Sequence, residues 1–193
     1  MIEVFAKAYP ADTPRTAVDD DFHDEVARAW PTQLHDLADA VGLGKHRRGM
    51  LELIDPRTYH PPFAEFFGGD SAGRTPFLLN AFGEPIAYKR VSAREAEISI
   101  LHTYGPKLEV LAYDLGDFFD RVLLTDDGLR QVLNVPLFND LHSRLRTLRP
   151  GQSYGFDPGV LAEEPAGTKA DASYFDVVDT VDHLALLLRR AEG

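Results

Sequence analysis

Four short apolar runs between residues 74 and 113 constrain the fold more than any other feature of this sequence. They read RTPFLLNAF, PIAYKRV, AEISILHTY and KLEVLAY, and the connections GE, SARE and GP separate them. Short apolar or alternating runs of this kind are typical of β-strands. Connections of two to four residues favour antiparallel neighbours, and Gly83 tolerates the positive φ that a tight turn needs. The sequence therefore predicts a four-stranded antiparallel meander.

Helical spacing of apolar residues flanks this central region. The expected helices are PTQLHDLADAVGL (31–43), PPFAEFFGG (61–69), DLGDFFDRVLL (114–124), PLFNDLHSRLRTLRPG (136–151) and TVDHLALLLRR (180–190). In the fourth, the apolar stripe continues to Leu148, and Pro150-Gly151 is expected to end the helix. In the fifth, Thr180 is the expected N-cap. Two further strands are expected in GMLELID (49–55) and ASYFDVV (172–178).

This order of elements predicts an α+β fold. Strands cluster centrally and helices cluster later, whereas a parallel doubly wound sheet would need steadier alternation. We expect a central, mostly antiparallel sheet of short strands with helices packed on it, and a helix-rich C-terminal half. The 193 residues, 44% of them hydrophobic, suffice for a buried core.

Charge and cysteine content narrow the possible partners. A formal net charge of −11 repels nucleic acid and anionic lipid. The absence of cysteine excludes disulfides, thiol catalysis and cysteine-ligated metals. The beginning of the chain lacks a secretory pattern, and no apolar run is long enough to span a bilayer. We therefore expect a cytoplasmic protein with neither a membrane nor a nucleic acid as a direct partner.

The glycine-rich stretch GQSYGFDPGVLAEEPAG (151–167) is the part of the sequence that most resembles a site. It does not contain a phosphate-binding loop, because no glycine stands five residues before Gly167 and no apolar strand precedes it. A nucleophile elbow is also missing from the chain. A pair of carboxylates brought together by the fold stays open as a hydrolytic alternative. The patterns predict neither an enzyme nor a cofactor.

Two pairs of residues have spacing that would allow a shared metal ion. Asp19 and His23 are four residues apart, and so are Asp179 and His183. Acidic residues in this position more often begin a helix, with the imidazole on its surface. We therefore expect no metal site.

Three charged segments remain as candidate contacts. They are the acidic run Asp19, Asp20 and Asp21, the basic run Lys45 to Arg48, and the adjacent pair Glu163 and Glu164. The simplest interpretation of each is a solvated loop. The acidic segments would also suit contact with a basic protein, because complementary charge speeds encounter and sets register. We take the five carboxylates as candidate partner-binding residues.

Longer motifs resemble a known bacterial family. RTPFLLNAFGEPIAYKR resembles the strand–turn–strand of the GAD-like domain around its AFG motif. WPTQLHDLADAVGLGKHRRGMLELIDPRTY resembles the helix, turn, strand and Asp-Pro-x-x-Tyr/Phe sequence of that domain. LFNDLHSRLRTLRPGQSYGFDPGVLAEEPAG, followed by DTVDHLALLL, is similar to the C-terminal half of the DUF1851 family. Where that family has paired glycines, this chain has Glu163 and Glu164.

The resemblance divides the chain into a GAD-like region (1–105) and a DUF1851-like region (106–193), expected to form one compact unit. It implies an immunity protein of the kind that neutralises DNase effectors of type VI secretion. Such a protein would bind its cognate toxin stoichiometrically. Two alternatives stay open: a small-molecule-binding regulatory domain without catalysis, and a hydrolase with clustered carboxylates or a His-plus-carboxylate pair in a cleft.

Overall fold

The computed structural model describes residues 1–12, 16–65, 73–92, 95–105, 107–157 and 171–191. Its α-helices are α1 (Ile2–Ala8), α2 (Asp20–Val26), α3 (Thr32–Val41), α4 (Pro56–Glu65), α5 (Leu115–Asp117), α6 (Asp126–Leu133), α7 (Val135–Arg144) and α8 (Thr180–Ala191). A π-helical turn, η1 (Phe118–Val122), and a 3-10 turn, η3 (Ala172–Tyr174), complete the helical elements. Among these described residues, no helix is long and apolar enough to cross a membrane.

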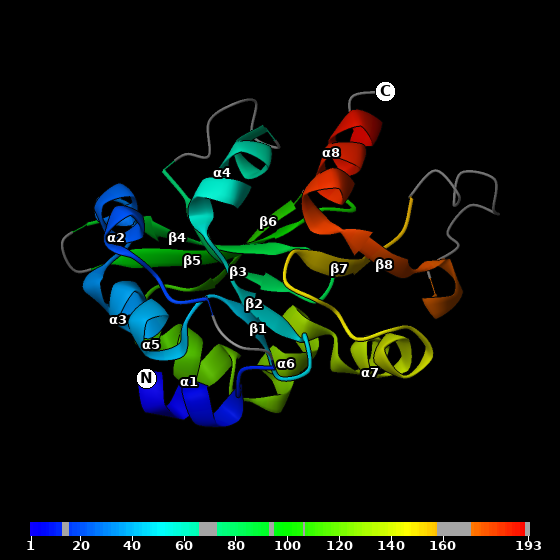
Figure 1. Ribbon diagram of the computed structural model, residues 1–193, viewed down its shortest axis with the longest axis horizontal. Coiled ribbons are helices and arrows are strands. Elements are labelled where there is room, and N and C mark those ends of the chain that lie inside the picture. The colour runs from blue at the N-terminus through cyan, green and yellow to red at the C-terminus, as the bar shows by residue number, and fades with distance from the viewer. Residues whose placement is uncertain (13–15, 66–72, 93–94, 106, 158–170, 192–193) are drawn as a thin grey trace.

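An antiparallel sheet forms the centre of the molecule (Figure 1). Its strands, in spatial order, are β1 (Gly44–His46), β2 (Leu51–Leu53), β3 (Thr75–Asn80), β4 (Pro85–Arg90), β5 (Ala96–His102) and β6 (Lys107–Ala112). The spatial order equals the chain order, so each strand pairs with its sequence neighbour. This arrangement confirms the predicted meander and the α+β fold, and extends the sheet by the β1–β2 hairpin.

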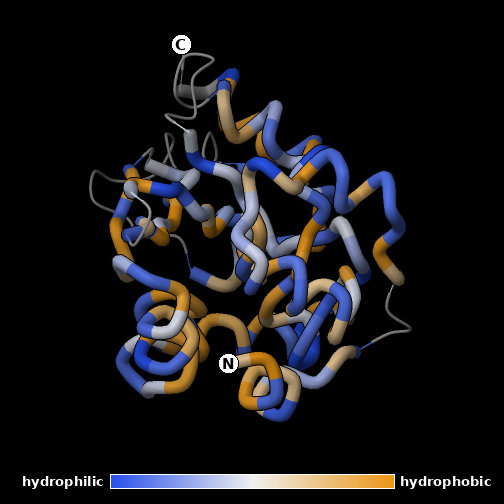
Figure 2. Tube along the Cα trace, turned by 90° about the vertical axis from the view of Figure 1, so that its left-hand side faces the viewer, coloured by the Kyte–Doolittle hydropathy of each residue, from blue (hydrophilic) through white to orange (hydrophobic). Residues whose placement is uncertain are grey.

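Helices cover both faces of this sheet. Leu78 and Ile86 belong to the main core, whose other members include side chains of α1, α3, α6 and α7. Their chain neighbours Leu79 and Ala87 point to the opposite face, where α4 and α8 pack. Figure 1 shows α4 and α8 on one side of the sheet and α1, α5 and α6 on the other. In Figure 2 the helical coils carry both hydrophobic and hydrophilic segments, as expected for helices with one buried face.

Helix α3 illustrates how the sequence specifies this packing. Leu34, Leu37, Ala38 and Val41 recur at helical spacing and are all buried. Gly42, at φ 72°, ends the helix, and its N–H donates to the carbonyl oxygen of Ala38. The predicted helix at 31–43 is therefore confirmed.

Two predictions at the ends of elements are wrong. Helix α7 ends at Arg144 rather than at Pro150-Gly151, because Leu145 is extended and Leu148 lies buried against Gly49. Tertiary contact thus overrides the continued helical spacing. Thr180 is the first residue of α8, and Asp179 caps the helix by accepting hydrogen bonds from the N–H groups of two residues in its first turn.

Two other predicted elements differ in type. The segment 172–178 begins as the 3-10 turn η3 and becomes strand β8 (Asp176–Asp179), which pairs with β7 (Gln152–Gly155) in a separate two-stranded sheet. The segment 114–124 contains the short α5 followed by η1. Helices α1, α2 and α6 and strand β1 were not expected from the sequence.

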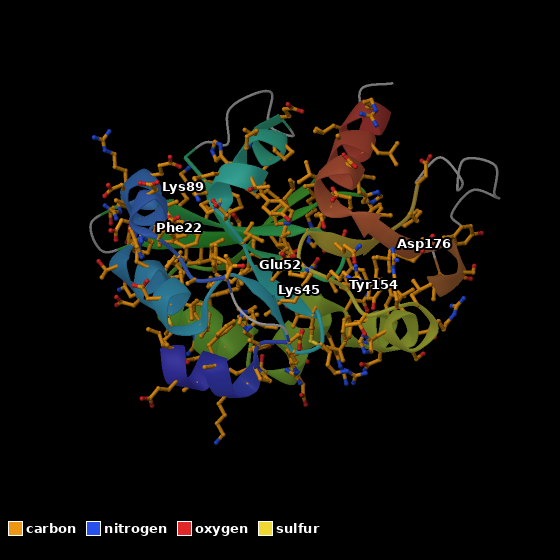
Figure 3. The ribbon with its side chains drawn as sticks, in the orientation of Figure 1. Phe22, Lys45, Glu52, Lys89, Tyr154 and Asp176 are labelled. Atoms are coloured by element: carbon orange, nitrogen blue, oxygen red, sulfur yellow. The ribbon has the colours of Figure 1, made fainter. Side chains whose placement is uncertain are left out.

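A buried ion pair connects the β1–β2 hairpin to β7. Lys45 and Glu52 are cross-strand neighbours, only 1% and 5% exposed, and their Nζ and Oε2 atoms are 2.6 Å apart. Lys45 Nζ also donates to the carbonyl oxygen of Gln152 at 2.6 Å, and the N–H of Gly151 donates to Glu52 Oε1 at 2.9 Å. Figure 3 shows the two side chains next to one another near the centre of the molecule. The pair therefore holds parts of regions 1–105 and 106–193 together.

Candidate functional site

The acidic run is part of a larger charged surface on α2 and α3. Asp19 accepts a hydrogen bond from the N–H of Phe22 at 2.8 Å and is the N-cap of α2, and Asp20 and Asp21 form its first turn. The run is therefore a helix start, not a solvated loop. All three side chains are exposed. Carboxylates at a helix N-terminus are favoured by the helix dipole, which is the local reason for this sequence.

Other acidic side chains from the same two helices join the run. We define the acidic face as the exposed carboxylates of α2, its N-cap and α3, namely Asp19, Asp20, Asp21, Asp24, Glu25, Asp36 and Asp39. Within the described part of the chain, Asp20, Asp21, Asp24 and Asp36 have no hydrogen-bond or ion-pair partner of their side chains. This surface lies at one end of the long axis of the molecule (Figure 1).

Two histidines hold α2 against α3 beneath this face. His23 and His35 approach with their Nδ1 atoms 3.0 Å apart, and His23 Nε2 lies 2.9 Å from Asp39 Oδ1. Burial, together with the neighbouring His23, lowers the pKa of His35. Glu25 is bound by Arg57 at 3.0 Å. The fold therefore brings Asp24, Asp36 and Asp39 to the run Asp19–Asp21, although sequence analysis did not select them.

A groove of about 690 Å³ opens at the N-terminal end of α3. Its lining combines Met1 and Thr32 with Arg90 and Glu95 from the β4–β5 hairpin and Asp114 at the start of α5. The first turn of α3 lines the groove, and Asp36 and Asp39 of the acidic face lie further along the same helix.

Two exposed apolar side chains adjoin this groove. Val91, 55% exposed, stands between the lining residues Arg90 and Ser92, and Tyr113, 71% exposed, precedes the lining residue Asp114. Tyrosine and arginine are enriched at the energetic centres of protein interfaces. A groove with polar lining residues and an exposed aromatic neighbour is better suited to contact with another protein than to binding a small apolar ligand.

The predicted basic run divides into a buried and an exposed half. Lys45 and His46 are buried, so this half of the solvated-loop interpretation is wrong. Arg47 and Arg48 form the turn after β1, at φ 50° and 65°, and Arg47 lies over the ring of Tyr9 at 5.2 Å. The Asp12 carboxylate accepts hydrogen bonds from the N–H groups of Arg48 and Gly49, which holds this unusual turn in place.

The side chains of the two Asp–His pairs that could have shared a metal ion make other interactions. Asp19 and Asp179 cap helices, and His183 Nε2 lies 2.9 Å from the hydroxyl of Tyr104. Burial lowers the pKa of His183. In the described ranges, no group of three histidine or carboxylate side chains is arranged to hold a metal ion. Glu163 and Glu164 lie outside the described residues, so their role stays a prediction.

A His-plus-carboxylate cluster does occur, formed by Glu84 directly before β4, His102 on β5 and Glu109 on β6. His102 Nδ1 is 3.0 Å from Glu84 Oε1, and His102 Nε2 is 3.3 Å from Glu109 Oε2. The hydrogen bond to Glu84, with the charges of both carboxylates, raises the pKa of His102 against the effect of burial. Because both ring nitrogens are engaged, His102 has none left to exchange a proton with a substrate. The cluster is better suited to holding charge than to acid–base catalysis.

Comparison with known proteins supports the fold. No family model matches the chain, and no curated protein matches it. The chain is similar to the crystal structure of Atu4351 from Agrobacterium tumefaciens, with a TM-score of 0.72 and 15% sequence identity. The similarity covers 98% of this chain and 89% of that chain. At this identity the likeness concerns the fold alone, and it extends over nearly the whole molecule.

Proposed function

We propose that this chain is a cytoplasmic immunity protein, of the GAD-like and DUF1851 kind that its sequence resembles, which binds and neutralises a cognate nuclease toxin. The observation that carries the proposal is the acidic face beside the groove at α3. Asp20, Asp21 and Asp24, whose carboxylates have no partner among the described residues, are available to an external basic surface. A protein with this function needs such a surface and no catalytic group of its own.

Inhibition follows from the chemistry of the proposed target. Nucleases hold nucleic acid with arginine and lysine side chains directed at phosphates. Carboxylates of the acidic face would form charge-assisted hydrogen bonds with those side chains and keep phosphates away. The long-range field of a −11 protein would speed the encounter.

The groove would supply the apolar part of the same interface. Tyr113 and Val91 stand exposed beside it, and Arg90 lines it. A stable complex would bury on the order of 1,200 Å² or more in total. That area requires more than the acidic run alone, so we assign both the acidic face and the groove to the contact.

Co-expression tests the function itself. The chain should rescue bacterial growth from the toxin encoded beside its gene, and the two proteins should co-purify as a stoichiometric complex. Persistent toxicity with both proteins soluble and well expressed would contradict the proposal. The toxin's nuclease activity, measured with purified proteins, should fall in proportion to added immunity protein.

Charge reversal tests the surface. The variant Asp20→Lys/Asp21→Lys changes two acids in the first turn of α2 and should abolish rescue. Asp126→Lys/Asp127→Lys is the matched control, because it changes two exposed acids in the first turn of α6. Glu163→Lys/Glu164→Lys tests the remaining pair from the sequence analysis. If only the α6 variant loses rescue, the acidic face is the wrong surface even where the function holds.

A further inference from the structure

A second cavity lies apart from the acidic face and its groove. It measures about 400 Å³ and shares no lining residue with the groove at α3. It lies between the β3–β4 turn, the end of β5 with the turn that follows it, the α6–α7 junction and the residues before β8, and its walls include Phe82, Leu137 and Phe175. Its volume falls within the range of about 300–1,000 Å³ that is usual for small-molecule sites.

One wall of this cavity carries the carboxylate of Glu84. Glu84 Oε2 accepts a hydrogen bond from Asn80 Nδ2 at 2.7 Å, and Glu84 Oε1 contacts His102. Glu109 contacts the other ring nitrogen of His102. Lys107 Nζ lies 3.8 Å from Glu109 Oε2, so Glu109 has a cation beside it, and of the two carboxylates only Glu84 lines the cavity. A carboxylate has about four lone-pair positions, so Glu84 can accept a further hydrogen bond from a ligand.

Another part of the lining is positively charged. Arg130 on α6 lines the cavity, is exposed, and has no carboxylate partner among the residues that the structure describes. Asn134, with the left-handed φ of 39°, joins α6 directly to α7 and also lines the cavity. This short junction fixes the position of the α6 C-terminus, which carries Arg130 in its last turn.

Aromatic rings also line the cavity. Phe175 packs edge-on against Phe82 at 6.1 Å and against Tyr104 at 6.5 Å. The hydroxyl of Tyr104 accepts from the N–H of Phe156 and pairs with His183. Since that hydroxyl is already satisfied, Tyr104 offers a ligand its ring. The cavity therefore combines a carboxylate, a guanidinium without a carboxylate partner among the described residues, and an apolar surface.

We propose that this cavity binds a small zwitterion of the amino-acid or dipeptide class. The ligand's ammonium group contacts Glu84, its carboxylate contacts Arg130, and its apolar side chain packs against Phe82 and Phe175. Phosphorylated ligands fit less well, because Glu84 repels their extra negative charge. The site goes beyond toxin binding, and it corresponds to the small-molecule alternative raised by the sequence.

The test titrates the purified full chain alone, so its outcome does not depend on a toxin. Calorimetry and NMR with free phenylalanine, leucine and methionine, and with alanyl-phenylalanine, should show binding below about 10 mM for at least one of them. N-acetylation or amidation of that ligand should weaken binding about tenfold or more, because each modification removes one charge-assisted contact. Absence of binding by all four compounds would overturn the proposal, and so would equal binding of the modified forms.

Matched variants test the assigned residues. Arg130→Ala and Glu84→Gln should each weaken binding about tenfold or more, whereas Arg144→Ala, an exposed arginine of α7 outside the lining, should leave it unchanged. The thermal midpoint of each variant without ligand shows whether it folds. Arg130→Ala decides the matter if Glu84→Gln fails to fold, since Arg130 is exposed. Unchanged binding in Arg130→Ala would contradict the assigned geometry.

Discussion

Lys45 and Glu52 are almost completely removed from water and neutralise one another, whereas the carboxylates of the acidic face stand in water with few partners. Lys45 belongs to the basic run and Asp19, Asp20 and Asp21 form the acidic run, and in the sequence both runs resemble solvated loops. The difference lies in their surroundings. Lys45 and Glu52 pair across antiparallel strands and contact the backbone of β7, whereas the carboxylates of the acidic face contact solvent. Buried charge therefore contributes to the structure here, and exposed charge is left for recognition.

The largest effect should come from breaking the buried pair. Glu52→Leu leaves the Lys45 ammonium without its counter-charge and the N–H of Gly151 without its acceptor. Such a change should lower the free energy of unfolding by about 3–5 kcal/mol, measured by denaturant titration. Burial lowers the pKa of Lys45 while Glu52 opposes that shift, so the ammonium loses its main support.

The double variant Lys45→Met/Glu52→Leu sharpens this prediction. Replacing both charges by apolar side chains should recover most of the loss, because neither charge then remains buried and unpaired. A double variant as unstable as Glu52→Leu would mean that the contacts to Gln152 and Gly151, rather than the charges, stabilise this region.

The next largest effect concerns binding. Asp20→Lys/Asp21→Lys should weaken toxin affinity about 30- to 100-fold, or roughly 2–3 kcal/mol, by calorimetry. Its free energy of unfolding should change no more than that of Asp126→Lys/Asp127→Lys, since both variants oppose a helix dipole in the same way. A large loss of stability in the α2 variant alone would mean that the acidic face, like the buried pair of Lys45 and Glu52, is needed for the fold.

Within the acidic face, Asp19 should behave differently from its neighbours. Its carboxylate is the N-cap of α2, so Asp19→Ala should lower the free energy of unfolding by about 1 kcal/mol. Asp21→Ala removes no hydrogen bond among the described residues and should cost less than about 0.5 kcal/mol. Equal costs, measured by thermal or chemical denaturation, would show that the run acts as one structural unit.

The smallest effect concerns His102. Its side chain is more exposed than those of Lys45 and Glu52 and less exposed than the carboxylates of the acidic face. Glu84 and Glu109 raise its pKa in the folded state above the unfolded value. The stabilisation from this cluster should be fully present below the unfolded pKa and disappear as pH rises through the folded one. The difference in unfolding free energy between the parent and His102→Gln should therefore shrink with increasing pH above about 6.5. A constant difference would contradict the role of the charge.

Elements with a strong local pattern were predictable from the sequence. Strands β3 to β6 follow from short apolar runs and tight turns, and Gly83 adopts the expected positive φ of 75°. The prediction placed the end of helix α7 too far along the chain. The apolar stripe continues through Leu145 and Leu148, although the backbone has already left the helix and Leu148 packs against Gly49. Local spacing cannot reveal such a distant contact.

The candidate sites were only partly predictable for the same reason. Asp19, Asp20 and Asp21 are adjacent in the chain, but Asp36 and Asp39 join them through the packing of His23 on His35. The spacing of Asp20 and Asp24, four residues apart, is a local signal that the face continues along α2. The residues of the second cavity, from Phe82 to Phe175, share no local pattern.

The contacts of Lys45 and Glu52 with Gly151 and Gln152 also determine when the β1–β2 hairpin can complete its folding during synthesis of the protein. Roughly 100 residues must be added after Glu52 before its partner segment is made, which takes about 5–20 s at translation rates of 5–20 residues per second. Until then both side chains keep their hydration, because burying them without the backbone of β7 would be unfavourable. The β1–β2 hairpin should therefore complete its native packing late, after most of the nascent chain has left the ribosome. A chain stalled before residue 151 should leave amides of this hairpin open to hydrogen exchange.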